Sequence, residues 1–95
     1  MAVGDAINTI TSIANGAYLS IQPGVGAEWI IHNILVSETA DIEFYVSDGT
    51  NEEKLLTVTG GLFDYHFHVT NDNFYKVKNV SGDIQYIGYD GIITK

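Results

Sequence analysis

The chain has 95 residues and a formal net charge of −8, with four lysines, no arginine and no cysteine. A chain of this length forms one small domain, and without cysteine neither a disulfide nor a thiolate metal site is possible. The shortage of cations argues against direct binding to nucleic acid or to an anionic membrane surface, because both need clustered Lys and Arg.

Turn signals divide the chain into short runs rich in Ile, Val, Thr, Tyr and Phe, the residues that favour β-strands. In chain order the predicted strands are residues 6–13, 17–22, 28–36, 42–47, 54–59, 62–69, 74–79 and 84–93. No window repeats apolar residues at helical spacing, so we expect essentially no helix. The pattern predicts a single all-β domain over residues 1–95, with eight short antiparallel strands in a jelly-roll-like sandwich or small barrel. Residues 1–5 are expected to form a flexible N-terminal arm.

Two local patterns carry further expectations. Asn15-Gly16 lies between two alternating runs and predicts a two-residue hairpin turn. The run WIIHNILV, residues 29–36, is apolar on both sides of the strand, with Trp29, Ile31 and Leu35 opposite Ile30, Ile34 and Val36. Such a strand is covered on its second face by other elements or by another subunit. Self-association is also a common remedy for a small core. The interface candidates are Ile7, Ile10, Trp29, Ile30, His32, His66 and His68.

The stretch GLFDYHFHVT raises the question of a metal or catalytic site. Alternation in a strand puts Asp64, His66 and His68 on one side and Phe63, Tyr65, Phe67 and Val69 on the core side. Two imidazoles and a carboxylate are possible zinc ligands, so these three residues are weak metal candidates. We favour a side that faces solvent or a neighbouring subunit. If it is an interface, protonation of the histidines near pH 6 predicts weaker association on acidification.

Two other features also have a functional and a structural interpretation. The loop DGTNEE, residues 48–53, gathers oxygen ligands as calcium prefers, but its spacing is not that of an EF-hand, which favours a solvated hairpin loop. Exposed aromatic rings on a β-sandwich could stack on sugars, although most aromatic residues here alternate in phase with the core. Tyr18, Tyr45, Tyr86 and Tyr89 are the tyrosines that the pattern does not place.

The segment IQPGVGAEWIIHNILV, the hairpin with DGTN, and the stretch YHFHVTNDNFYKVKNVSGDIQYIGYDGIITK together resemble a family of phage proteins. These are the small β-sandwich capsid decoration (cement) or head-fibre proteins of tailed bacteriophages. The resemblance covers most of the chain from Ser20 onward, and its clearest pieces are residues 22–36 and the sequence VTNDNFYKVKNVSG. These pieces are turns and strand entries, not active-site motifs, so the resemblance transfers no catalytic residue.

The resemblance implies a virion structural protein on the outer capsid surface, made in the host cytoplasm. It implies a homotrimer that bridges major capsid subunits, with no cofactor. The alternative is a phage fibre or tail-associated module that binds host-surface glycans through exposed aromatic side chains. An enzyme is not expected, because no acid–base pair or nucleophile motif is evident in the sequence.

Overall fold

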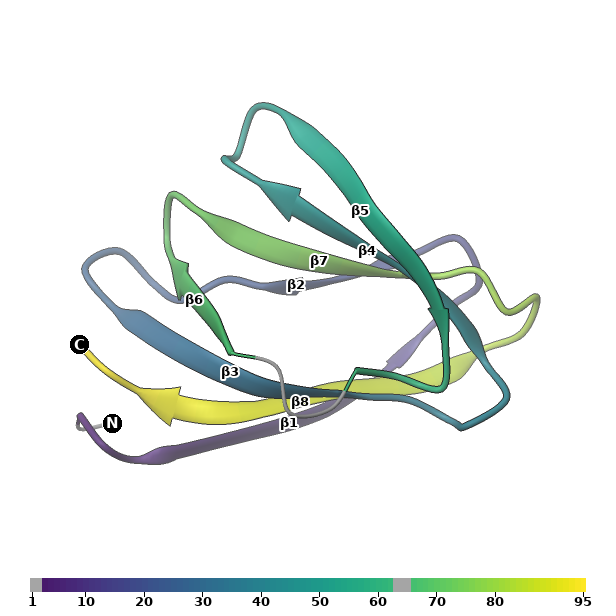
Figure 1. Ribbon diagram of the computed structural model, residues 1–95, viewed down its shortest axis with the longest axis horizontal. Coiled ribbons are helices and arrows are strands. Elements are labelled where there is room, and N and C mark those ends of the chain that lie inside the picture. Colours follow the sequence, from purple (N-terminus) through teal and green to yellow (C-terminus); the bar gives the residue numbers. More distant parts are fainter. Residues whose placement is uncertain (1–2, 63–65) are drawn as a thin grey trace.

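The computed structural model describes residues 3–62 and 66–95, and this part of the chain contains eight strands and no helix (Figure 1). The strands are β1 (Ala6–Ile13), β2 (Tyr18–Ile21), β3 (Glu28–Leu35), β4 (Asp41–Ser47), β5 (Glu52–Thr59), β6 (Phe67–Thr70), β7 (Phe74–Asn79) and β8 (Gln85–Ile93). The prediction of an all-β chain with eight antiparallel strands is confirmed. The described residues hold no helix of the length and hydropathy needed to cross a membrane.

The strands form two four-stranded antiparallel sheets, sheet A in the order β1-β8-β3-β6 and sheet B in the order β2-β7-β4-β5. Figure 1 shows two layers, with β1, β3 and β8 in the lower one and β2, β4, β5 and β7 in the upper one. Of the eight strands, only β4 and β5 are neighbours both in the chain and in a sheet. The Asn15-Gly16 hairpin prediction is therefore wrong. A turn does form there, with Gly16 at φ 85°, but it leads from sheet A to sheet B.

The hydrophobic core lies between the two sheets. Phe44 stacks on Tyr75 with ring centroids 5.1 Å apart, and Phe67 packs against Phe44 with centroids 4.9 Å apart. Fully buried aliphatic side chains from both sheets surround this aromatic group: Ile21, Ile31, Ile34, Ile42, Val69, Val77 and Ile87. Each contributes about 1.5–3 kcal/mol relative to an exposed side chain. The two sheets are therefore joined by interdigitating side chains from alternate strand positions.

Strand β3 departs from simple alternation at His32. Its pairing with β8 shifts by one residue between Ile31 and Asn33, which makes His32 the extra residue of a β-bulge. The bulge changes which side chains point inward, so both Ile31 and Ile34 are fully buried. The sequence pattern predicted Ile34 on the side opposite Ile31, and that prediction is wrong because alternation is not preserved across a bulge.

The predicted strand at residues 62–69 is also interrupted. Leu62 forms an isolated bridge to Ile34, and β6 begins only at Phe67, which pairs with Ile31. The two pairs are thus three residues apart on β3, from Ile31 to Ile34, but five residues apart on the partner segment, from Leu62 to Phe67. The insertion explains why Leu62 is buried whereas His66 is exposed, although simple alternation put them on one side. Phe63, Asp64 and Tyr65 lie outside the described residues.

The expected N-terminal arm is hydrogen-bonded to the end of β8. The backbone N–H of Gly4 donates to the carbonyl of Ile93 at 2.7 Å, and the N–H of Ile93 donates to the carbonyl of Asp5 at 3.0 Å. The chain is therefore attached to sheet A from Gly4 onward. Met1 and Ala2 lie outside the described residues.

Asn79 is a fully buried polar residue that links the two sheets at one end of the fold. Its amide nitrogen donates to the carbonyl oxygens of Ile13 at 2.8 Å and Asp83 at 2.7 Å, and its amide oxygen accepts from the N–H and hydroxyl of Ser81. Asn79-Val80-Ser81 matches a glycosylation sequon. Because the side chain is buried and fully hydrogen-bonded, the folded chain does not present it for glycan attachment.

We predict that Asn79→Ala lowers the free energy of unfolding by about 3 kcal/mol, because it leaves buried carbonyl groups without donors. Urea denaturation followed by circular dichroism measures the change. Asn15→Ala is the matched control, since Asn15 accepts a single exposed hydrogen bond from the N–H of Gly82 at 2.9 Å. Its expected cost is below about 1 kcal/mol, and an equal loss for both variants would contradict the role assigned to Asn79.

Candidate interaction surfaces

The outer side of sheet A carries an exposed group of hydrophobic side chains, which we call the apolar face. It consists of Ile10 on β1, Tyr86 and Ile92 on β8, and Ile30 and Leu35 on β3. Ile10 is 62% exposed, Tyr86 is 70% exposed and Ile92 is 36% exposed. The strand register sets Ile92 directly between Ala6 and Ile30, and Gly88 between Ile10 and Leu35. The apolar face therefore extends over three neighbouring strands, in two rows separated by the polar row of Asn8, Asp90 and Asn33.

The predicted interface candidates fall in different places. Ile10 and Ile30 belong to the apolar face, whereas Ile7 is 7% exposed and lies in the core. Trp29 points inward and packs on Tyr89, with ring centroids 6.2 Å apart. The burial of Ile7 and Trp29 is thus explained within one chain. Sequence reasoning missed Tyr86, Ile92 and Leu35, although alternation with the buried residues of β8 could have indicated the first two.

The three histidines gather where β3 meets β6. The rings of His32 and His66 lie edge to face with centroids 5.2 Å apart. Nε2 of His68 lies 2.9 Å from Oε1 of Glu28, and Nζ of Lys95 lies 3.6 Å from Oε2 of the same carboxylate. His66 and His68 are both exposed, as expected for the side facing away from the core.

The described residues provide no cluster of side chains that would support a metal site here. Within residues 3–62 and 66–95, no three His, Asp or Glu side chains come together in a group that could hold a metal ion. His68 contacts Glu28, and His66 contacts His32. Asp64, the third weak metal candidate, lies outside the described residues.

The acidic loop after β4 is a hydrogen-bonded turn beside an open hollow. Oδ1 of Asp48 accepts from the N–H of Thr50 at 2.9 Å and the N–H of Asn51 at 2.7 Å, and these bonds lower the pKa of Asp48. The hollow has a volume of about 220 Å³, and its lining includes Glu52 and Glu53. Because the Asp48 carboxylate caps its own turn, this geometry favours the hairpin-loop interpretation.

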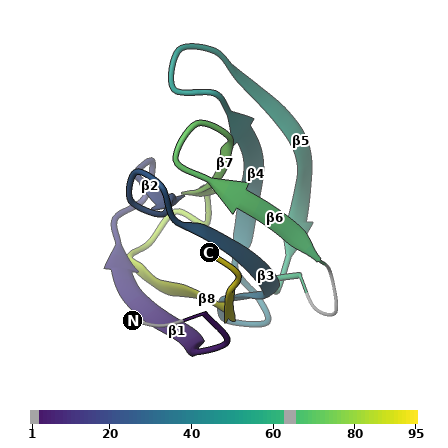
Figure 2. The same cartoon turned by 90° about the vertical axis from the view of Figure 1, so that its left-hand side faces the viewer.

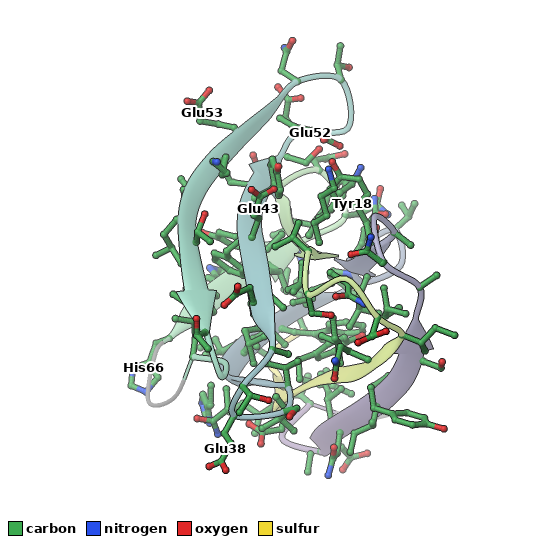
Figure 3. All side chains as sticks on the ribbon, turned by 90° about the vertical axis from the view of Figure 1, so that its right-hand side faces the viewer. Tyr18, Glu38, Glu43, Glu52, Glu53 and His66 are labelled. Carbon is green, nitrogen blue, oxygen red and sulfur yellow. The ribbon has the colours of Figure 1, made fainter. Side chains whose placement is uncertain are left out.

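The outer side of sheet B, in contrast, combines tyrosines with ion pairs. We call it the polar face, and it consists of Tyr18, Glu43, Tyr45, Lys54, Lys76 and Lys78. The Tyr18 and Tyr45 rings meet edge to face with centroids 5.5 Å apart, and Nζ of both Lys76 and Lys78 lies 5.6 Å from the Tyr18 ring centroid. Figure 3 shows Tyr18 and Glu43 on this side of the molecule, with Glu52 near the adjoining turn.

Glu43 is the centre of the hydrogen bonds on the polar face. The Tyr45 hydroxyl donates to its Oε1 at 2.7 Å, and Nζ of Lys54 lies 3.4 Å from its Oε2. The Tyr45 hydrogen bond, with help from Lys54, lowers the pKa of Glu43. The same bond and burial raise the pKa of Tyr45 above its ordinary value. Glu43 is therefore ionised and Tyr45 protonated at neutral pH.

The four unplaced tyrosines do not form one sugar-stacking surface. Tyr89 lies inside the fold against Trp29, Tyr18 and Tyr45 lie on the polar face, and Tyr86 is exposed on the apolar face. A ligand on one outer side of the sandwich would therefore meet either Tyr86 or the pair Tyr18 and Tyr45.

We predict that Tyr45→Phe raises the pKa of Glu43 toward its ordinary value of 4.5, because the variant removes the donated hydrogen bond. NMR titration of the Glu43 carboxyl carbon measures this change. When the pKa of a Glu is lower in the folded chain than in the unfolded chain, its ionised form stabilises the fold at pH values above the unfolded-state pKa. This stabilisation is lost as the pH falls through the folded-state pKa. The stability difference between wild type and Tyr45→Phe should thus shrink in acid. Tyr86→Phe is the control, and an unchanged Glu43 titration in Tyr45→Phe would contradict the assignment.

Comparisons with known proteins leave the family of the chain open. No protein-family model matches the sequence, and a search of the curated proteins finds no match. Any functional proposal therefore depends on the sequence resemblance, on the two outer faces with their charges, and on the strand order described above.

Proposed function

We propose that the chain is a virion structural protein that binds the outer surface of a tailed-phage capsid as an oligomer. There it stabilises contacts between major capsid subunits and catalyses no reaction. The sequence resemblance described above supports this function. So does the apolar face, which gives a small acidic sandwich a surface suited to protein contact.

The strand order offers a second line of support. Sheets ordered β1-β8-β3-β6 and β2-β7-β4-β5 are the arrangement expected of a jelly roll, in which two Greek keys of four strands wrap into a sandwich. We propose that the chain is a jelly roll on this basis. Viral capsid domains and lectins both use this architecture, so it agrees with the leading function and with the alternative.

The observation that carries the proposal is the exposure of Ile10, Tyr86 and Ile92 on one sheet. Exposed apolar side chains that gather on one face of a protein often mark a contact with a partner. The acidic remainder of the surface suits a position outside the shell, because packaged DNA would repel it. The net charge of −8 also favours a capsid partner whose contact surface is apolar or basic.

A second candidate function is glycan binding on the polar face. Tyr18 is 41% exposed, and it lies beside Tyr45 and two lysines. A tyrosine ring flanked by hydrogen-bonding groups suits stacking against a sugar. This candidate predicts that Tyr18→Ala abolishes binding on an array of host-surface glycans, whereas the leading function predicts no glycan binding by wild type.

Co-sedimentation with DNA-emptied capsids of a tailed phage tests the leading function. We expect wild type to pellet with the capsids and Tyr86→Ser to bind at least tenfold more weakly, because the variant removes the most exposed side chain of the apolar face. Ile84→Ser is the matched control, since Ile84 is 67% exposed but precedes β8. Wild type that stays in the supernatant at every capsid concentration would overturn the proposal.

A further inference from the structure

Strand β1 is a long sheet edge that no element of the described chain covers. It is hydrogen-bonded to β8 on one side and ends sheet A on the other. Its pairing runs from Ala6 to Ile13 without any shift in register. Figure 2 places β1 at the margin of the molecule, with β2 on the same side. The free edge therefore offers a regular row of backbone donors and acceptors.

The other three sheet edges carry features that discourage pairing with another chain. Strand β5 begins with Glu52, Glu53 and Lys54, and it contains a bulge next to Lys54. Strands β2 and β6 have only four residues each. Charges, bulges and short length are the devices by which proteins protect sheet edges. The sequence of β1, AINTITSI, has no charge, no proline and no bulge.

The charge distribution along the chain singles out the same side. Residues 6–27 contain no Asp, Glu, Lys, Arg or His, although the chain has twelve acidic residues. These residues form β1, β2, the turn between them and the loop that follows β2. Both strands are the end strands of their sheets on one side of the sandwich. Two copies with a charge of −8 each can approach through this side without bringing their acidic groups into contact.

We propose that β1 pairs antiparallel with β1 of a second copy, about a two-fold axis that passes between the Ile10 residues of the two copies. In an antiparallel pair, residues directly opposite each other point to the same side of the sheet. When a strand pairs with its own copy, core side chains therefore lie opposite core side chains only if the symmetry axis lies at a residue and not between two residues of the strand. Centring on Ile10 sets Ile7 of each copy opposite Ile13 of the other. Both side chains are 7% exposed and face the core. The pairing therefore makes the hydrophobic cores of the two copies continuous.

The pairing also covers the exposed side chain at the centre of β1. Ile10, which is 62% exposed, lies beside Ile10 of the second copy, and apolar cross-strand pairs of this kind stabilise a sheet. The two four-stranded A sheets become one eight-stranded sheet with closed two-fold symmetry. This inference concerns the oligomer of the proposed function and rests on it for a biological role. It gives a dimer in place of the homotrimer that the resemblance implies.

Size-exclusion chromatography with light scattering of the full chain tests the pairing. Wild type should have twice the chain mass of 10.4 kDa, and Ile10→Lys should have the mass of a single chain, because it opposes two lysines at the axis. Leu55→Lys is the matched control, since Leu55 is 50% exposed on the opposite edge strand, and it should keep the dimer. Circular dichroism checks that each variant is folded. A single-chain or trimer mass for wild type, or a dimer of Ile10→Lys, would overturn the inference.

Cysteine cross-linking tests the register without destabilising the dimer. The chain has no cysteine, so one introduced thiol can bond only to its equivalent in the second copy. Opposed Cα atoms lie about 4.5–5.5 Å apart in an antiparallel pair, within disulfide range. Ile10→Cys should therefore form a covalent dimer under oxidising conditions. Ser12→Cys should not, because four residue steps separate the two thiols by about 13 Å. Cross-linking of Ser12→Cys in preference to Ile10→Cys would contradict the register.

Two further measurements separate this inference from an interface at the histidines and from the proposed capsid function. The histidines lie near β3 and β6, so an interface at β1 predicts the same dimer mass at pH 7.5 and pH 5.5, and dissociation at pH 5.5 would contradict it. Capsid co-sedimentation is scored independently. A wild-type dimer that ignores capsids overturns only the capsid function, whereas a wild-type monomer that pellets with capsids overturns only the β1 pairing.

Discussion

The buried side chain of Asn79 fixes the end of the fold where the two sheets are joined. Its amide connects the last residue of β1 to β7 and to the turn before β8, while its backbone exchanges hydrogen bonds with Gly16 and Ala17. A buried amide is costly unless every donor and acceptor is paired, and here the partners come from segments far apart in the sequence. In this fold β1, β7 and the turn before β8 together satisfy it. The packing of the core stabilises the sandwich, and Asn79 specifies how its layers meet.

Departures from regular pairing decide where the histidines lie. One is the bulge at His32, and the other is the unequal spacing of the pairs Ile34–Leu62 and Ile31–Phe67. His32 and His66 therefore meet beside the β3–β6 pair. Away from these interruptions, regular pairing between β1 and β8 keeps Ile10 and Tyr86 on the outer side.

Charge is distributed just as unevenly. Every Asp, Glu and Lys lies at Asp5 or from Glu28 onward, and three of the four lysines lie on the polar face with their carboxylate and tyrosine partners. Exposed ion pairs of this kind contribute little stability. The arrangement leaves one uncharged side, formed by β1 and β2, on a strongly acidic protein. The proposed capsid function and the proposed dimer both depend on this segregation of charge, at different surfaces.

The sequence by itself determined the strands, because local alternation and turn residues act within a few positions of the chain. It correctly put His66 and His68 on the side facing away from the core and Val69 on the core side. The tertiary structure alone decided which strands are neighbours, that Asn15-Gly16 joins two sheets, and that Ile34 and Leu62 point inward. Backbone hydrogen bonds between strands are the same for every residue type, so local sequence cannot choose a partner strand or place a bulge. That choice depends on how the whole set of apolar side chains packs, which only the complete fold specifies.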